Sequence, residues 1–191
     1  MNSEDFENNW LFFKYKTILS YENLQTIYDN IIKSKHIYGS TAEIGVYQGY
    51  TSKMIVEITK KTHYCYDTFE GVIHSNIFKG DKHKEGEFSC SLEEVVKIIN
   101  NKNVVYRKGD FPETFQEKTV NFSFVYSDTT TQYGAKHTLE TFAKRISTGG
   151  KLLFFIDDKC QGVRTVVDKF IEKDLLFHVE KKNQIIVFTK K

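Results

Sequence analysis

A carboxylate and two glycines share one short stretch, Ala42-Glu43-Ile44-Gly45-Val46-Tyr47-Gln48-Gly49, where an apolar run gives way to a turn and then to a helical pattern. The spacing Glu-x-Gly-x-x-x-Gly differs from the Gly-x-Gly-x-x-Gly fingerprint, which presents a helix N-terminus to a pyrophosphate. Glu43 would repel a phosphate, so the turn suits a cofactor with a cationic part. A plain strand, turn and helix of an α/β protein is the alternative.

A second carboxylate indicates what kind of cofactor this would be. Asp67 follows the turn by about the spacing at which an acidic residue accepts hydrogen bonds from ribose hydroxyls. S-adenosylmethionine combines a nucleoside with a sulfonium and an ammonium group, and it therefore suits Glu43 and Asp67 together. Asp110, after Gly109, could accept from an adenine amine while Phe111 lies against the ring. Both aspartates could instead cap turns.

Three further carboxylates, Asp128, Asp157 and Asp158, follow two later apolar runs. If those runs are neighbouring strands, their ends lie about 5 Å apart, and like charges at that distance favour a shared cation. Oxygen ligands are typical of a hard divalent ion, so the cluster predicts Mg²⁺ or Mn²⁺. Asp158 could alternatively cap the next helix.

Two histidines are candidates for a general base near neutral pH, because their ordinary pKa lies close to it. His83 stands in the long loop before residue 91, and His137 follows the fourth apolar run. Either could equally be a surface residue. Asp128 is the third candidate for this role.

The elements that must position these residues alternate between apolar runs and helical patterns, which is typical of parallel strands joined by crossover helices. After one or two helices within residues 6–35, we expect strands at 41–46, 63–66, 104–108, 122–127 and 151–156, helices at 51–60, 92–100, 136–145 and 163–172, and an antiparallel hairpin of 176–179 with 185–189. The predicted fold is α/β and Rossmann-like.

Composition excludes several classes of protein. With 191 residues, 40% of them hydrophobic, and a net charge of +2, the chain fits a globular domain without a nucleic-acid partner. No apolar stretch approaches the roughly 20 residues of a membrane span, and we expect a cytoplasmic protein. Exposed aromatics near residues 10–13 could support a homodimer.

Cys65, Cys90 and Cys160 fit neither a disulfide framework nor a four-ligand zinc site, which predicts a packing role.

The motifs taken together resemble class I S-adenosylmethionine-dependent methyltransferases, and most closely the macrocin O-methyltransferase (TylF-like) family. The resemblance covers about residues 41–170. Its most specific part is Asp67-Thr68-Phe69-Glu70-Gly71, and further matches are Gly86-Glu87-Phe88, Ser91-Leu92-Glu93-Glu94, Lys108-Gly109-Asp110-Phe111 and Ile156-Asp157-Asp158.

This resemblance implies a mostly parallel seven-stranded sheet with helices on both faces, in a methyltransferase domain of residues 38–191. Residues 1–37 would be a helical segment that caps the site or mediates self-association. A Mg²⁺ ion would be bound by Asp128, Asp157 and Asp158. The implied cofactor-binding residues are Glu43, Gly45, Tyr47, Gly49, Thr51, Ser52, Asp67, Thr68, Phe69, Gly109, Asp110, Phe111 and Asp128.

The expected reaction is methyl transfer to a hydroxyl of a sugar or another small hydroxylated metabolite. Family members have Asp-x-Asp-x-Tyr after the fourth strand, whereas this chain has Thr130 and Gln132 in place of the second acid and the tyrosine. Two alternatives therefore stay open. One is a catechol-type methyltransferase acting on an aromatic diol, and the other is an inactive partner protein that binds S-adenosylmethionine.

Overall fold

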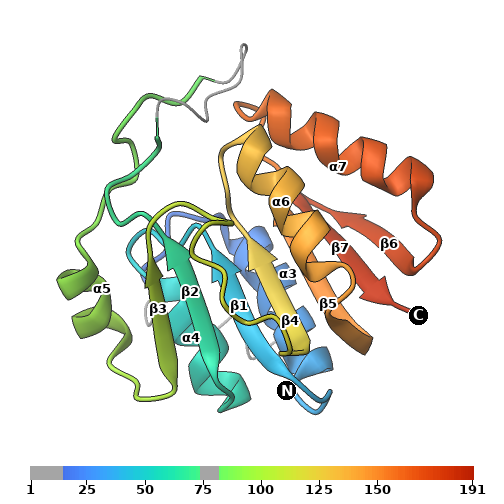
Figure 1. The fold of residues 1–191 in the computed structure, drawn as a ribbon, viewed down its shortest axis with the longest axis horizontal. Coiled ribbons are helices and arrows are strands. Elements are labelled where there is room, and N and C mark those ends of the chain that lie inside the picture. The colour runs from blue at the N-terminus through green and yellow to red at the C-terminus, as the bar shows by residue number, and fades with distance from the viewer. Residues whose placement is uncertain (1–14, 74–81) are drawn as a thin grey trace.

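A computed structural model of the chain describes residues 15–73 and 82–191. These residues form a seven-stranded sheet in the order β3-β2-β1-β4-β5-β7-β6, in which β7 alone runs opposite to the other six strands (Figure 1). The predicted α/β fold and the C-terminal hairpin are confirmed. The strands are β1 (Ser40–Ile44), β2 (His63–Asp67), β3 (Val104–Lys108), β4 (Phe122–Ser127), β5 (Ile146–Phe155), β6 (Phe177–Lys182) and β7 (Ile185–Lys190).

Helices cover both faces of this sheet. The described helices are α3 (Tyr21–Ser34), α4 (Tyr50–Thr59), α5 (Leu92–Ile99), α6 (Gln132–Phe142) and α7 (Gln161–Lys173). Helices α6 and α7 pack side by side on one face, and α3 and α4 pack on the other (Figure 1). Ser91 and Glu94 form the capping box that the sequence predicts at the start of α5.

The alternation of side chains along β4 divides the core between the two faces. Phe124 and Tyr126 belong to the cluster that packs under α3 and α4. Val125 belongs to the cluster under α6 and α7, where it lies with Phe142. Because all of these side chains are fully buried, β4 is covered on both faces, as expected for a central parallel strand.

Strand β1 lies between β2 and β4 and pairs in parallel with both. The order of the strands reverses at this point, because β2 and β3 continue to one side of β1 and β4 and β5 to the other. Ligands of open α/β sheets bind at such a switch point, beyond the carboxyl ends of the strands. The glycine turn after β1 is therefore at the expected place for a ligand site.

The two largest differences between the predicted and observed boundaries are a helix and a strand that begin earlier than predicted. Helix α6 begins at Gln132 rather than at residue 136, because the Thr131 side chain accepts a hydrogen bond from the Gly134 N–H and caps the helix. Strand β5 begins at Ile146 rather than at residue 151, so Gly149, with φ +78°, lies within the strand.

Helix α3 lies within the 1–37 segment, whose first fourteen residues, aromatics included, are outside the described part of the chain. A capping or dimer-forming role for this segment stays a prediction.

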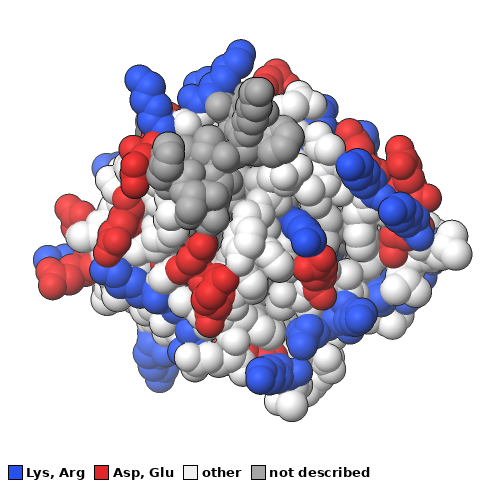
Figure 2. Space-filling view, turned by 45° about the horizontal axis from the view of Figure 1, so that its top comes forward, with Lys and Arg blue, Asp and Glu red and all other residues white. Residues whose placement is uncertain are grey.

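No helix among residues 15–73 and 82–191 has the length and apolarity that a bilayer crossing requires. On the face shown in Figure 2, Lys and Arg side chains are interspersed with Asp and Glu, and the absence of a nucleic-acid partner also stays a prediction.

Candidate active site

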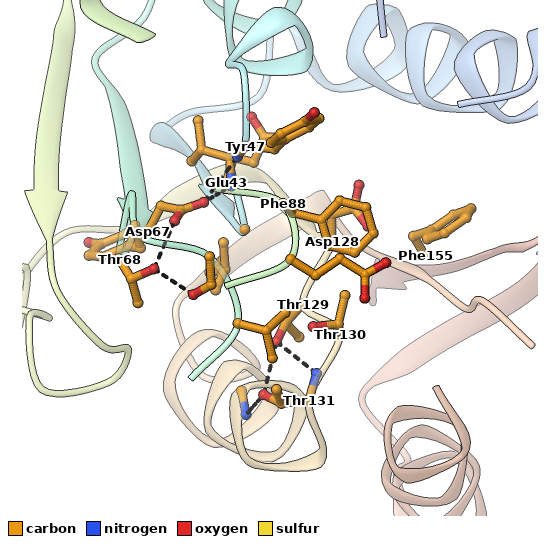
Figure 3. Close-up of a pocket in the computed structure, with 18 of the residues that line it drawn as sticks. Glu43, Tyr47, Asp67, Thr68, Phe88, Asp128, Thr129, Thr130, Thr131 and Phe155 are labelled. Carbon is orange, nitrogen blue, oxygen red and sulfur yellow. Dashed lines mark hydrogen bonds between the residues drawn. The ribbon is translucent and has the colours of Figure 1, made fainter. Parts of the chain in front are cut away.

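A cavity of about 280 Å³ opens beyond the carboxyl ends of β1 to β5. Figure 3 shows three of its carboxylates, which come from β1, from the end of β2 and from the loop after β4. The structure thus brings together residues that are spread over more than a hundred positions of sequence. The predicted site residues that line the cavity are Glu43, Gly45, Tyr47, Gly49, Thr51, Asp67, Thr68, His83, Gly109, Asp110, Phe111, Asp128 and Asp157.

The glycine turn needs its glycines for steric reasons. Gly45 has φ +80°, and a Cβ added there would lie 2.6 Å from the backbone oxygen of Asp128. Gly49, the N-cap residue of α4, has φ +84°, and its Cβ would meet the Val95 side chain at 2.9 Å. Any larger residue would separate the turn from the elements packed against it.

Asp67 organises this turn from the neighbouring strand. Its Oδ2 accepts hydrogen bonds from the backbone N–H groups of Val46 (2.6 Å) and Tyr47 (3.0 Å), and its Oδ1 accepts from the N–H of Phe69 (2.7 Å). A carboxylate offers about four acceptor positions, so most of this capacity is used within the protein. The predicted contact with ribose stays a prediction, and the structure adds a positioning role for the same side chain.

Glu43 lies almost fully buried beside the cavity, where it accepts a hydrogen bond from the Ser52 hydroxyl. Burial raises the pKa of Glu43 well above its usual range, the Ser52 bond opposes this, and the nearby charges of Asp128 and Asp67 raise it further. The Ser52 hydroxyl also lies 3.0 Å from His63 Nε2. Burial lowers the pKa of His63 to about 3, so this ring is neutral.

Asp128 has the electrostatics of a proton acceptor that works near neutral pH. Burial raises the pKa of its carboxyl to about 7, while a hydrogen bond from the Tyr126 hydroxyl (3.1 Å) opposes this and the charges of Asp157 and Asp67 add to it. A general base is most effective when its pKa lies near the working pH. Asp128 is therefore better suited to this role than an ordinary aspartate.

Four predicted site residues do not line the cavity. Ser52 is fully buried and acts through Glu43. Phe69 has φ +57°, which directs its ring into the core beside Val95. His137 lies 3.1 Å from Glu140 on the same helix.

The fourth of these residues is Asp158, which is the third oxygen ligand of the predicted metal site. Its side chain is 89% exposed and pairs with Arg164 at 3.1 Å. Adjacent residues point to different sides unless the backbone bends, and only Asp157 faces the cavity.

The residues present therefore do not fit the predicted magnesium site. Two of its three oxygen ligands, Asp128 and Asp157, line the cavity, but the third is directed to solvent. Among the described residues, the one group of three His, Cys, Asp or Glu side chains whose ligand atoms all lie within 4.8 Å of one another is His83, Asp157 and Cys160. A nitrogen, an oxygen and a sulfur are not the donors that Mg²⁺ prefers.

Other lining residues were not predicted as site residues. Thr129, Thr130 and Thr131 line the cavity before α6, and Phe155 lines it from the end of β5 (Figure 3). Phe88 packs edge-on against Tyr47, with ring centroids 5.7 Å apart. The resemblance at Gly86-Glu87-Phe88 indicates this loop, whereas no signal in the sequence singles out Cys160 for the site.

Solved structures with the same architecture include O-methyltransferases. NovP matches with a TM-score of 0.78 and 17% identity, over 92% of this chain and 82% of that chain. The calicheamicin methyltransferase CalS11 matches with a TM-score of 0.75 and 15% identity, over 99% and 86%. This chain has the fold of class I O-methyltransferases.

A third similar structure is an O-methyltransferase from Bacillus cereus in complex with SAH. It matches with a TM-score of 0.63 and 12% identity, over 100% of this chain and 92% of that chain. No protein-family model matches the sequence, and no curated protein does.

Proposed function

We propose that the chain transfers a methyl group from S-adenosylmethionine to a hydroxyl of a small, sugar-like acceptor, as a member of the TylF-like family. The observation that carries this proposal is the convergence of Glu43, Asp67 and Asp128 around one cavity at the switch point of a methyltransferase fold. Structures of this fold include one with SAH and one with SAM, the O-methyltransferase TomG from Streptomyces achromogenes.

Each end of the cofactor would meet a chemically suitable group. The cationic methionine part would lie near Glu43, and the nucleoside near Asp67 and Asp110. Phe111 would lie beside the adenine with its exposed edge only, because its ring stacks on Phe142 with centroids 5.8 Å apart. The protein would thus contribute mainly by orienting the sulfonium toward the acceptor.

The acceptor hydroxyl would lose its proton to Asp128 as its oxygen attacks the methyl carbon, and S-adenosylhomocysteine would leave. The pKa of about 7 at Asp128 supports this assignment, since half of the enzyme then holds the base in its active form near neutral pH. This mechanism assigns no role to Mg²⁺ or Mn²⁺, because Asp158 does not complete the predicted ligand set.

A sugar-like acceptor is favoured by one neighbour in particular. CalS11 is described as a TDP-rhamnose 3′-O-methyltransferase, and its apo structure matches with a TM-score of 0.66 over 99% of this chain. Thr129, Thr130 and Thr131 give this cavity a polar wall. The hydroxyls of Thr129 and Thr131 bond to each other and to backbone N–H groups at the start of α6, so the Thr130 hydroxyl would be the one that meets a hydroxylated acceptor.

The test is a methyl-transfer screen with labelled S-adenosylmethionine, comparing nucleotide-activated sugars with catechols. We expect label in a sugar product, with turnover lost in Asp128→Asn and retained in Asp158→Asn, which alters a carboxylate outside the cavity. Label in a catechol alone would replace the proposed acceptor, and tight cofactor binding without transfer to any acceptor would favour the inactive partner protein.

A further inference from the structure

A second chemical centre lies on the wall of the cavity, where His83, Asp157 and Cys160 meet. His83 comes from the loop before α5, and the other two come from the β5–α7 connection. A backbone hydrogen bond from the Lys82 N–H to the Lys159 oxygen (3.1 Å) joins these two segments and brings the three side chains together.

The His83 ring is oriented by one nitrogen and unsatisfied at the other. Nδ1 lies 3.1 Å from Glu87 Oε2, which also accepts from the Lys84 N–H at 3.0 Å. Nε2 is buried and has no hydrogen-bond partner among the described residues, and the side chain as a whole is only 3% exposed. Buried polar atoms without a partner are rare in folded proteins, so this nitrogen needs an explanation.

The distance from His83 Nε2 to Asp157 offers an explanation for this unpartnered nitrogen. Asp157 Oδ2 lies 3.8 Å away, which is too far for a hydrogen bond. Two ligands of a tetrahedral zinc ion, each about 2.0–2.1 Å from the metal, lie about 3.4 Å apart. Asp157 Oδ1 accepts from the Lys159 N–H at 2.9 Å, and this bond leaves Oδ2 as the oxygen that faces the histidine.

We propose that His83, Asp157 and Cys160 bind a zinc ion through one nitrogen, one oxygen and one sulfur. Their ligand atoms all lie within 4.8 Å of one another, and all three residues line the cavity. Glu87 then has the role of the carboxylate that holds a metal-bound histidine in orientation. Three protein ligands leave the fourth position of a tetrahedral ion open toward the cavity, as in catalytic rather than structural zinc sites.

The donor set distinguishes this site from the predicted magnesium site. Thiolate and imidazole ligands suit zinc, whereas Mg²⁺ takes oxygen ligands. Cys160 and Asp158 therefore separate the two alternatives, since the zinc site needs the first and the magnesium site the second. Metal binding is measured without any methyl acceptor, so the outcome does not depend on the proposed function.

The experiment uses the full chain, reduced and stripped of metal, and titrates it with Co²⁺ as a spectroscopic substitute for zinc. We expect one equivalent to bind with tetrahedral visible bands and a thiolate-to-cobalt band, both removed by an equivalent of Zn²⁺ and unaffected by excess Mg²⁺. Cys160→Ser should abolish the thiolate band, whereas Cys90→Ser and Asp158→Asn should retain it. Glu87→Gln should weaken Zn²⁺ binding about 10- to 100-fold.

The proposal is overturned if Co²⁺ gives no thiolate band, if the band disappears in Cys90→Ser, or if Mg²⁺ displaces the metal and Asp158→Asn weakens its binding. Should Cys160→Ser fail to fold, His83→Gln replaces it, and an unchanged cobalt spectrum in that variant contradicts the site equally.

Discussion

Asp67 accepts a hydrogen bond from the backbone N–H of Tyr47 at 3.0 Å, and Tyr47 has φ +50°, a left-handed conformation that residues other than glycine rarely adopt. The carboxylate at the end of β2 thereby stabilises a strained turn at the end of β1. Two of the strands that end at the cavity, β1 and β2, are connected through this side chain, so cofactor binding should depend on it even where it does not touch the cofactor.

Replacing Asp67 with alanine should release the glycine turn. The N–H groups of Val46, Tyr47 and Phe69 would lose their acceptor, and we expect a loss of about 1–3 kcal/mol in the free energy of unfolding together with a loss of S-adenosylhomocysteine binding. Denaturant unfolding and calorimetry measure the two effects. Asp67→Asn, which retains one acceptor oxygen, should lie between the wild type and Asp67→Ala, and wild-type binding by the alanine variant would contradict the positioning role.

Gly45→Ala tests the close approach of the turn to the loop after β4. The added Cβ would lie 2.6 Å from the backbone oxygen of Asp128. We therefore expect the free energy of unfolding to fall by about 2–4 kcal/mol and the loop that carries Asp128 to shift. Gly86→Ala is the matched control, because Gly86 also has a positive φ (+76°) but its Cβ would meet no atom within 4 Å. Equal losses in the two variants would show that backbone strain, rather than the contact, determines the effect.

The sequence predicts the strand ends well because apolar runs and glycine turns are local signals. It identifies Glu43, Asp67 and Asp128 because each stands at such an end. The direction of a side chain beyond a strand is set by backbone turns that the pattern does not encode, and for this reason the sequence does not predict that Asp158 is exposed or that Phe69 packs in the core.

The true start of α6 also changes where His137 lies. With α6 expected at residue 136, this histidine would stand in the first turn beside the cavity. The cap at Thr131 starts the helix earlier, and His137 instead pairs with Glu140. Cys160 lies outside local prediction altogether, because only tertiary contacts between two loops bring it near His83.

The raised pKa of Asp128 predicts a pH dependence of stability. Between the ordinary value of 3.8 and the folded value of about 7, the unfolded chain loses this proton while the folded chain retains it, so stability falls as pH rises through this window. Asp128→Asn removes the contribution and should be about 1–3 kcal/mol more stable than the wild type at pH 8, with no advantage at pH 4. Denaturant melts at both pH values measure the difference, and a variant less stable at pH 8 would contradict the shift.

Glu43 should make cofactor binding depend on pH and on whether the sulfur atom of the cofactor carries a positive charge. Its pKa is raised in the empty protein, and a nearby cation favours the ionised form, so S-adenosylmethionine should bind more tightly as pH rises and release a proton on binding. Glu43→Gln should weaken S-adenosylmethionine about 10-fold more than S-adenosylhomocysteine, which lacks the sulfonium, or about 1.4 kcal/mol. Calorimetry in buffers of different ionisation enthalpy measures the number of protons released. Equal losses of affinity for both ligands in Glu43→Gln would contradict a role of Glu43 in binding the sulfonium.

Binding of S-adenosylhomocysteine to the purified chain tests the central claim most directly. Calorimetry should give saturable binding of one molecule per chain, abolished in Gly45→Ala and Asp67→Ala while both variants remain folded, and unchanged in Asp158→Asn. Absence of saturable binding by the folded wild-type protein, or binding that Asp67→Ala leaves intact, would contradict the assignment of this cavity to the cofactor.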